Sequence, residues 1–299
     1  MIGAALVRRS GVDGHASLVG VEGQPDWTDG RAVDRFFAKT RPDQVIVAAG
    51  RTEGIGGNQQ HPADLMLDNL LVAAHVIPAA WRYGARKLMD LASSCTYPMA
   101  ASQPWKTDAI GTGATEPTSA ASAAAKLAGI TLCEAYSQQH GAHYIAAVVA
   151  DVFGPGDAFG SDGHGHVVSD LMSRMHEGRV TGAKSMTVWG SGIPRREFIY
   201  IDDLADAALF LMRAYEDQAP INIGTGVTTS IRELAETMRE VGGFRGDLVF
   251  DPGRPDGAPV KSLDTAPLRA LGWVPSWELR AALESTYEWF LACEACQAR

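Results

Sequence analysis

The sequence predicts an α/β protein built on a doubly wound parallel sheet, followed by a smaller C-terminal domain. Short apolar runs rich in β-branched residues alternate with segments of helical period, which is the pattern of βαβ units. The chain has 299 residues, of which 46% are hydrophobic and 20% are charged. A chain of this size and balance buries a large core, so disordered and fibrous classes are excluded.

The first half of the chain contains most of the predicted sheet. After the start Met1-Ile2-Gly3, the chain enters a predicted helix at once. Apolar runs then predict strands, and the segments between them predict helices by their period of about 3.6 residues. The predicted strands are 17–21, 44–49, 87–92 and 144–149, with two later ones at 198–201 and 221–223. The predicted helices are 31–39, 64–83 and 118–140.

The composition of the sequence changes after Gly154. Residues 154–166 are rich in glycine and other helix breakers, which is typical of a loop that covers a site. We therefore expect a first domain at 1–165 and a second one at 166–299. Segments near 196–226 are expected to return to the first domain.

Two helices are predicted in the second domain. Ser230 and Glu233 have the spacing of a capping box, in which each residue caps the other's backbone N–H. This pattern predicts a helix at 231–241, and a closing helix is expected at 277–296.

Charge and hydropathy limit the partners of the protein. It has 26 Lys and Arg against 35 Asp and Glu, a formal net charge of −9, and no long basic run. Binding to nucleic acid depends on clustered cations, so no nucleic-acid partner is expected. The longest nearly apolar stretch, 70–81, is shorter than the roughly 20 residues that span a bilayer. The start of the chain lacks the order of a secretory signal, so we expect no membrane association and a cytoplasmic location.

The four cysteines are too few for a disulfide framework in a chain of this length. Cys95, Cys133, Cys293 and Cys296 are therefore expected to be thiols. The last two have the spacing of a metal-binding or redox pair, but no second pair accompanies them. We predict no metal site.

Two groups of polar residues are candidates for a chemical role. Ser93 and Cys95 follow the predicted strand 87–92, at the end of the sheet where open α/β proteins bind ligands. Small polar residues there also commonly satisfy backbone groups. Ser122 and Lys126 lie one helical turn apart on one face. Taken alone, that pair is explained more simply as a solvated lysine on an alanine-rich helix.

Further motifs are more specific when taken together. They are Asp-Val-Phe-Gly-Pro at 151–155, the loop with His164 and His166, Val-Trp-Gly-Ser-Gly at 188–192, the segment 195–203 and Asn-Ile-Gly-Thr-Gly at 222–226. In this order and spacing the chain resembles the extended short-chain dehydrogenase/reductases, the NAD-dependent epimerase/dehydratase family, whose sheet is Rossmann-like. Ser-Ser-Cys-Thr-Tyr-Pro at 93–98 points to the GDP-L-fucose synthase branch. The resemblance covers essentially the whole chain.

The resemblance implies a reaction and a set of catalytic residues. Enzymes of that branch bind NADPH and convert GDP-4-keto-6-deoxymannose to GDP-L-fucose, by epimerising C3 and C5 and then reducing the C4 ketone. The cysteine and the histidine that exchange protons next to the ketone fall at Cys95 and His166. The serine and the lysine that polarise the carbonyl fall at Ser93 and Lys126. Lys126 is also placed to contact the nicotinamide ribose.

The chain departs from the family pattern at three places. Ser122 stands where the family has its catalytic tyrosine, and an alkanol is a far weaker acid than a phenol, whose pKa is about 10. The first strand and most of the Gly-rich turn that holds the pyrophosphate are absent, which leaves Gly3 as the cofactor-binding residue of that turn. Asp151 replaces an asparagine. Either translation starts upstream or ordinary dinucleotide binding is abandoned, so we expect weak or no binding of NADPH.

More of the family pattern is kept at the positions that bind the substrate. Arg174, Trp189, Arg196 and Lys261, together with His166, match positions that hold the GDP-sugar. Arginine suits phosphate because its planar donors bind two oxygens at once. Taken singly, the cations are equally well explained as surface charges and the tryptophan as a core residue.

We therefore predict an enzyme that retains a nucleotide-sugar pocket and proton-transfer chemistry but has an impaired reductase. The first domain would hold the nucleotide cofactor and the second one mainly the substrate, and the family resemblance favours a homodimer. Three alternatives stay open. One is complete NADPH-dependent epimerisation and reduction if an upstream start exists. The others are a scaffold recruited to a different redox-neutral reaction and a non-catalytic relative that binds a ligand.

Overall fold

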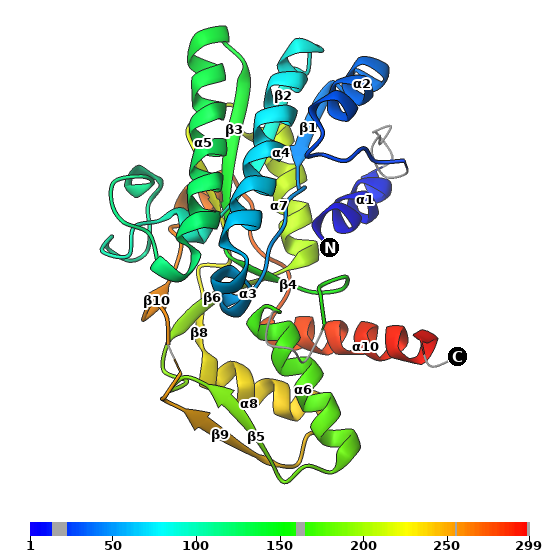
Figure 1. Ribbon diagram of the computed structural model, residues 1–299, viewed down its shortest axis with the longest axis vertical. Coiled ribbons are helices and arrows are strands. Elements are labelled where there is room, and N and C mark those ends of the chain that lie inside the picture. The colour runs from blue at the N-terminus through cyan, green and yellow to red at the C-terminus, as the bar shows by residue number, and fades with distance from the viewer. Residues whose placement is uncertain (14–22, 160–164, 255, 298–299) are drawn as a thin grey trace.

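The computed structural model describes residues 1–13, 23–159, 165–254 and 256–297. The predicted strand 17–21 and His164 lie outside these residues. The molecule is elongated, with a sheet and its helices in the upper part of Figure 1 and a second group of strands and helices in the lower part.

The upper part contains a parallel sheet with the strand order β1-β2-β3-β7. Its strands are β1 (Gln44–Val47), β2 (Lys87–Ser93), β3 (His143–Val149) and β7 (Ile221–Ile223). β2 and β3 are buried along nearly their whole length, as expected for strands covered by helices on both faces. Within the part of the chain that the structure describes, β1 pairs only with β2. The parallel sheet confirms the predicted fold class.

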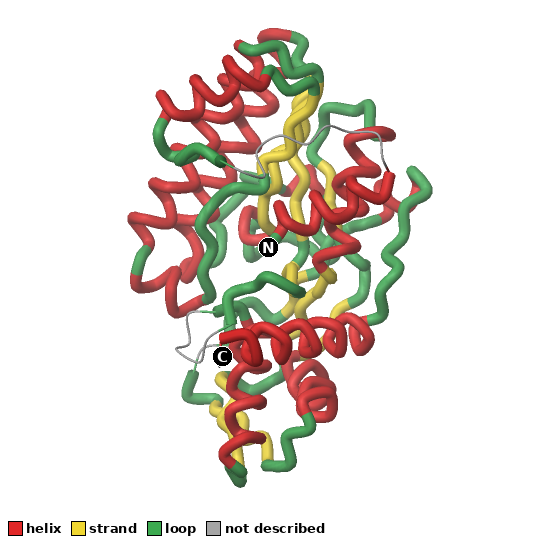
Figure 2. Tube along the Cα trace, turned by 90° about the vertical axis from the view of Figure 1, so that its right-hand side faces the viewer, coloured by secondary structure: helices red, strands yellow, loops and turns green. Residues whose placement is uncertain are grey.

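Helices cover both faces of this sheet, and Figure 2 shows the strands between them. The helices on one face are α2 (Gly30–Thr40), α4 (Pro62–Arg82) and α5 (Ala120–His140). Those on the other face are α1 (Ile2–Asp13) and α7 (Ile201–Ala214). α1 begins directly after Met1, and α2, α4 and α5 confirm the helices predicted from periodicity.

The lower part is organised around β6 (Arg195–Tyr200), which pairs parallel with β4 and β10 and antiparallel with β8. These partners are β4 (Asp151–Phe153), β8 (Thr228–Ser230) and β10 (Val260–Lys261). A separate parallel pair consists of β5 (Ser185–Trp189) and β9 (Asp247–Asp251). The helices are α6 (Val167–Thr181), α8 (Ile231–Gly242) and α10 (Leu279–Gln297).

Short elements complete the described chain: α3 (Ile55–Gln60), α9 (Ala266–Ala270) and the 3-10 turns η1 (Ser94–Thr96), η2 (Thr107–Ala109) and η3 (Pro117–Ser119). The chain crosses between the two parts of the molecule more than once. α7 and β7 return to the upper sheet, whereas β6, at the start of the segment 196–226, stays in the lower part. β4 precedes the domain boundary expected at residue 165, yet it pairs with β6.

The capping box predicted at Ser230 is confirmed. Ser230 Oγ accepts the backbone N–H of Glu233 at 3.1 Å, and Glu233 Oε2 accepts the backbone N–H of Ser230 at 2.8 Å. Two of the backbone donors at the start of α8 are satisfied in this way, which fixes where the helix begins.

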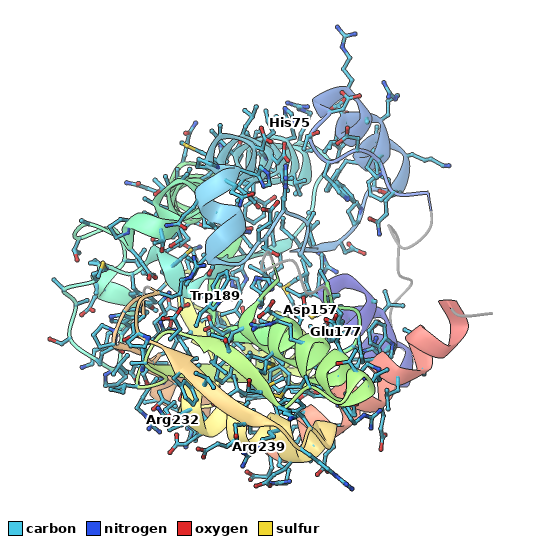
Figure 3. All side chains as sticks on the ribbon, turned by 60° about the horizontal axis from the view of Figure 1, so that its bottom comes forward. His75, Asp157, Glu177, Trp189, Arg232 and Arg239 are labelled. Atoms are coloured by element: carbon cyan, nitrogen blue, oxygen red, sulfur yellow. The ribbon has the colours of Figure 1, made fainter. Side chains whose placement is uncertain are left out.

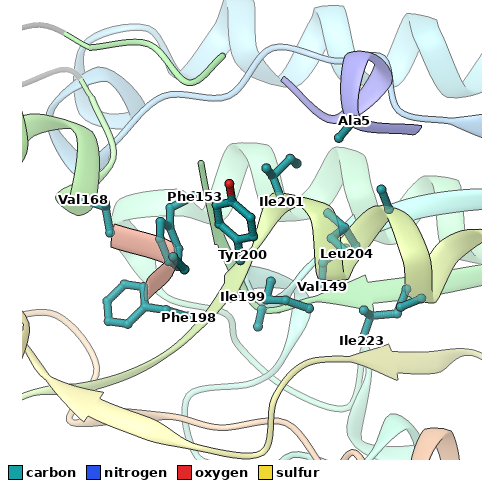
Figure 4. Packing of buried hydrophobic residues seen from close by; sticks show 14 of the residues in the cluster. Ala5, Val149, Phe153, Val168, Phe198, Ile199, Tyr200, Ile201, Leu204 and Ile223 are labelled. Atoms are coloured by element: carbon teal, nitrogen blue, oxygen red, sulfur yellow. The ribbon is translucent and has the colours of Figure 1, made fainter. Parts of the chain in front are cut away.

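Side chains of β4, β6 and α7 form the core near the junction of the two parts, as Figure 4 shows. The ring centroid of Phe153 lies 5.8 Å from that of Tyr200 and 6.4 Å from that of Phe198. Ala5 of α1 and Ile223 of β7 belong to the same apolar cluster. This packing fixes the end of β4, where the glycine-rich loop begins.

α4 is long and apolar enough, by length and composition alone, to cross a membrane, with a mean hydropathy of 1.3 in its most apolar window. The apolar stretch 70–81 is thus part of a longer apolar helix than the sequence indicated. In this structure 44% of that window is buried inside the protein, and the helix packs beside α5. One such helix is weak evidence for a membrane span, because core helices pass the same test.

One carboxyl group is buried inside the sheet. Asp90 lies on β2 and is 3% exposed. Burial raises the pKa of this carboxyl, and the Lys126 ammonium opposes that effect. Gly129 on α5 makes the necessary room, because a Cβ at that residue would lie 2.5 Å from Asp90 Oδ2.

Candidate active site

The turn after β2 places Ser93 and Cys95 at the carboxyl end of the sheet. Ser93 Oγ accepts the backbone N–H of Cys95 at 3.4 Å, and Thr96 Oγ1 donates to Ser93 O at 2.8 Å. Behind the turn, Tyr97 donates its hydroxyl to Asn222 Oδ1 at 2.6 Å. These contacts hold Cys95 half-buried at the position that the sequence predicted for a ligand site.

Burial and the charges of three side chains act on the pKa of the Cys95 thiol. Burial raises the pKa of the thiol, and the Asp151 carboxylate raises it further. The Ser93 hydroxyl and the ammonium groups of Lys261 and Lys126 lower it without cancelling the effect of burial, so the net pKa is raised. At neutral pH the thiol therefore keeps its proton and is suited to donate it.

α5 carries Ser122 and Lys126 one turn apart, as predicted. Lys126 Nζ donates to Leu91 O on β2 at 2.9 Å, which holds the ammonium beside the strand that leads to Cys95. Ser122 Oγ donates to Asn58 Oδ1 at 2.7 Å. The Ser122 hydroxyl, at the position where the family has its tyrosine, thus links α5 to α3 and donates its proton to the side-chain amide oxygen of Asn58.

A charged cluster that the sequence did not predict flanks α3, with Arg51 and Glu53 before the helix and His61 directly after it. Glu53 Oε1 accepts from Arg51 Nε at 2.9 Å, and its Oε2 lies 2.9 Å from His61 Nδ1. The hydrogen bond with His61 and the contacts with Arg51 lower the pKa of Glu53 against the effect of burial. Gly57 is required here, because a Cβ at that residue would lie 2.1 Å from Glu53 Oε2.

His166 precedes α6 and lies against a buried carboxylate. Its Nδ1 is 3.6 Å from Asp157 Oδ1, and the side chains are 40% and 6% exposed respectively. Figure 3 shows Asp157 close to α6. The contact with Asp157 raises the pKa of the imidazole, burial lowers it, and the charges of Asp157 and Asp151 raise it further. The net pKa of His166 is raised, so its imidazolium form persists to a higher pH.

One carboxylate connects the two predicted proton-transfer groups. Asp151, at the start of β4, raises the pKa of Cys95 and also that of His166. The interaction between charges weakens with distance and is screened by solvent. Both groups thus lie within electrostatic reach of Asp151. That the thiol and the imidazole act together in one site stays a prediction.

Arg196 and Lys261 gather around Glu116. Lys261 Nζ lies 2.6 Å from Glu116 Oε2, and the two side chains are 17% and 9% exposed respectively. Arg196 donates to the carbonyl of Ala258 at 2.6 Å and to that of Asp256 at 3.3 Å. Burial alone would raise the pKa of Glu116, but the charges of Lys261 and Arg196 outweigh it, and the pKa is lowered. Glu116 was missed because no local pattern pairs it with Lys261.

Arg174 and Trp189 make their contacts at α6, β5 and the turn after β9. Arg174 donates to Asp170 Oδ2 at 3.1 Å and to the carbonyl of Thr187. Trp189, labelled in Figure 3, is 48% exposed, and the guanidinium carbon of Arg254 lies 4.8 Å from its ring centroid. This exposure excludes a core role for Trp189. The substrate-binding roles of both residues stay predictions.

Two features fit a dinucleotide cofactor. The first turn of α1 has backbone N–H groups without acceptors inside the helix, which favours an anionic group. Gly3 lies in that turn, with nothing within 4 Å of the position that a Cβ would take. Lys126 lies at β2, on the side of the sheet covered by α5. The cofactor roles of Gly3 and Lys126 stay predictions.

The cysteines and the residue types that can bind a metal ion were also predicted from the sequence. Cys95, Cys133 and Cys293 are free thiols, as predicted, and the side chain of Cys296 lies outside the described part. Across the described ranges, no group of three or more His, Cys, Asp or Glu side chains is arranged to hold a metal ion.

The sequence matches a model of the NAD dependent epimerase/dehydratase family over residues 1–224. GDP-L-fucose synthase 1 from Arabidopsis thaliana is 42% identical over 292 residues, which cover 97% of this chain and 90% of the relative. GDP-L-fucose synthase from Escherichia coli K12 is 41% identical over 301 residues, covering 97% and 94% respectively.

Solved structures agree with this match. A GDP-6-OMe-4-keto-L-xylo-heptose reductase from C. jejuni has a TM-score of 0.91 and 30% identity, with coverage of 98% of this chain and 95% of that one. A GDP-mannoheptose C4 reductase from Campylobacter jejuni, with NADP bound, has a TM-score of 0.86 and 30% identity, with coverage of 97% and 95%. The fold and the resemblance predicted from the sequence are both confirmed.

Proposed function

The chain belongs to the NAD dependent epimerase/dehydratase family, and on this basis we propose that it moves protons at the carbons next to the ketone of a GDP-linked 4-keto sugar. The curated relatives are named GDP-L-fucose synthases, and the solved neighbours are named reductases of GDP-linked sugars. These names support the substrate class. The location in the cytoplasm is part of the same proposal.

One observation carries the choice of proton transfer. The Asp151 carboxylate acts on both Cys95 and His166, which supports the assignment of the thiol and the imidazole to one site. The raised pKa of Cys95 keeps the thiol in the acid form near neutral pH, and an imidazole such as His166 takes up and returns protons in the same range. A thiol and an imidazole on opposite sides of a carbon are the groups that an epimerisation needs.

The reaction balances without an external reductant. One group of the pair removes the proton from the carbon beside the ketone, and the electron pair of the C–H bond moves into an enolate. The Ser93 hydroxyl and the Lys126 ammonium stabilise the negative charge on the enolate oxygen. The other group then returns a proton to the opposite face of the carbon, and exchange with solvent restores both groups.

We propose further that reduction of the ketone is impaired in this chain. A bound NADPH would supply hydride, with Lys126 and the first turn of α1 as the residues that would hold it. Hydride addition also requires a proton for the ketone oxygen, and the tyrosine that supplies it in the family is replaced by Ser122. That hydroxyl is committed to Asn58 at 2.7 Å, and an alkanol is a poor proton donor near neutral pH.

The proposal is tested by incubating the protein with GDP-4-keto-6-deoxymannose in D₂O without NADPH. We expect NMR to detect deuterium at C3 and C5, because each deprotonation and return draws on solvent protons. Incorporation no faster than in buffer would exclude the proposed exchange. The remaining candidates would then be a scaffold recruited to another redox-neutral reaction and a non-catalytic ligand-binding relative.

Restoring the phenol with Ser122→Tyr is expected to raise NADPH oxidation less than tenfold. A tyrosine at this position loses the hydrogen bond to Asn58, and restoring the phenol leaves the nicotinamide site incomplete. General acid catalysis contributes roughly 10²- to 10⁴-fold only when the groups are aligned. The measurement is NADPH consumption with the keto sugar, with Ser122→Ala as the control for loss of the hydroxyl. A gain of a hundredfold would contradict the prediction.

The names of the relatives also favour a second candidate, complete epimerisation and reduction. Robust oxidation of NADPH by the unmodified chain, with a micromolar dissociation constant in a fluorescence titration, would support this second candidate. It would also contradict the impaired reductase and the weak binding expected from the sequence.

We propose that the protein is a homodimer that buries the outer face of α4. Met66, Leu67 and Trp81 on this helix are 38%, 55% and 45% exposed respectively. Large exposed apolar side chains gathered on one element are typical of an association surface. Leu67→Glu is expected to shift the protein from dimer to monomer in sedimentation velocity, whereas Val180→Glu on α6, also at an exposed position, is expected to leave it unchanged.

A further inference from the structure

Asp157 is a carboxylate with no assigned role in the reaction, yet it is built into the site. Its side chain is 6% exposed. Oδ1 accepts the backbone N–H of Ala158 at 2.9 Å, whereas Oδ2 is buried and has no hydrogen-bond partner among the residues that the structure describes. Burying a carboxylate oxygen without a donor costs free energy, so such an atom calls for a functional reason.

The local backbone holds this carboxylate against His166. The ring centroid of Phe159 lies 5.1 Å from that of Phe290 and 5.8 Å from that of Trp289, both on α10. This packing anchors the segment that follows Asp157. Gly165 passes so close to this segment that a Cβ there would lie 3.3 Å from Ala158 O. This close approach leaves His166 Nδ1 3.6 Å from Asp157 Oδ1.

We propose that Asp157 is a positioning residue for His166. It accepts a hydrogen bond from Nδ1–H and thereby leaves Nε2 as the nitrogen that exchanges protons with the sugar. A neutral imidazole carries one N–H, so directing it to the carboxylate puts the lone pair on Nε2. The separation of 3.6 Å is longer than a hydrogen bond, and catalytic hydrogen bonds of this kind shorten when substrate binds. The inference rests on the proposed function of the site.

Two carboxylates act on the imidazole, and only one of them suits a selective test. Asp157 raises the pKa of His166 by its contact and its charge, and Asp151 adds a smaller effect, while burial opposes both. Asp151 also acts on Cys95, so its removal would disturb both proton-transfer groups. Substitution of Asp157 therefore changes the environment of the imidazole without removing a carboxylate that acts on the thiol.

The first measurement needs no substrate. In the full chain, the ring C–H signals of His166 are followed by NMR against pH and assigned with His166→Gln. We expect the pKa of His166 to be above that of an ordinary histidine, to fall in Asp157→Asn and to be raised again in Asp157→Glu. Asp202→Asn serves as the matched control. Asp202 lies at the start of α7 and pairs with Arg8, and its substitution is expected to leave the pKa of His166 unchanged.

The second measurement is the pH profile of deuterium exchange into the keto sugar. In Asp157→Asn we expect the limb that reports protonation of His166 to move to lower pH, with the rate at neutral pH about tenfold lower or more. KM for the sugar nucleotide is expected to change less than threefold, because the effect is on proton transfer. A role of Asp157 that is only structural would lower the rate without moving the limb.

Several results would overturn the inference, and they differ from failure of the proposed function. The inference is wrong if His166 in the unmodified chain titrates at or below an ordinary histidine, a result that does not depend on whether any variant folds. It is also wrong if Asp157→Asn leaves the pKa unchanged or if Asp157→Glu does not restore it. Absence of deuterium exchange in the unmodified chain, with the NMR titration as expected, would instead refute the proposed substrate chemistry and leave the Asp157–His166 contact in place.

Discussion

Replacing Cys95 with alanine is expected to slow deuterium incorporation at C3 and C5 by a factor of roughly 10² to 10⁴. The substitution removes the thiol that keeps its proton at neutral pH, so a carbanion formed beside the ketone has no acid on one of its faces. The measurement is the rate of incorporation by NMR at matched protein concentration. Because Cys95 is a half-buried residue in a turn, its replacement is expected to leave the fold intact.

Cys293→Ala is the matched control for this prediction. Cys293 is also a half-buried free thiol, but it lies on α10. Its replacement is expected to leave the exchange rate within a factor of two. If Cys95→Ala exchanged as fast as Cys293→Ala, the thiol would have no part in the reaction and His166 would act with another group.

Replacing Glu116 with alanine is expected to lower the free energy of unfolding by about 3 kcal/mol, because removal of one member of a largely buried ion pair leaves the other charge uncompensated. Lys261 lies 2.6 Å from this carboxylate, and Arg196 also acts on it. The measurement is urea denaturation at pH 7. In the exposed pair of Glu240 and Arg280, with side chains 59% and 53% exposed, Glu240→Ala is expected to cost less than about 1 kcal/mol.

The pH dependence of this effect has a definite sign. The pKa of Glu116 is lower in the folded chain than its ordinary value. Its stabilising contribution is therefore fully present above the pKa of the unfolded chain and is lost as the pH falls through the folded pKa. The difference in stability between the unmodified chain and Glu116→Gln should shrink on acidification. A loss below 1 kcal/mol at pH 7 in Glu116→Ala would show that Lys261 and Arg196 are stabilised by other groups.

Local signals predicted much of the fold. Ser230 and Glu233 lie three residues apart, and their mutual capping requires nothing from the rest of the chain, so the start of α8 was predictable. β2 and β3 are continuous apolar runs because both of their faces are covered by helices. The same reasoning did not predict that β4 pairs with β6, since the pairing of short strands depends on how distant segments pack.

The parts of the site that the sequence did not predict are contacts between distant residues. Ser122 was predicted as a changed catalytic position, but its hydrogen bond to Asn58 depends on where α3 lies. Asp157 is an ordinary loop aspartate in the sequence, and only the fold brings it beside His166, the contact on which its proposed role rests. Arg196 was predicted as a substrate ligand from the family resemblance and from the affinity of arginine for phosphate, whereas its donors also hold the carbonyl of Ala258. Residue type alone does not distinguish these uses of a guanidinium.

Asp90 makes folding of the sheet a reaction that binds a proton. Because burial raises its pKa in the folded chain, the native state holds this proton more tightly than the unfolded chain does. Stability from the neutral carboxyl is fully present below the unfolded pKa and is lost as the pH rises toward the folded one. Glu116 has the opposite linkage, since its folded pKa is lowered. Proton uptake at Asp90 and proton release at Glu116 are therefore of opposite sign and partly cancel, so folding in mildly acidic solution exchanges fewer protons than the two groups would if both acted in the same direction.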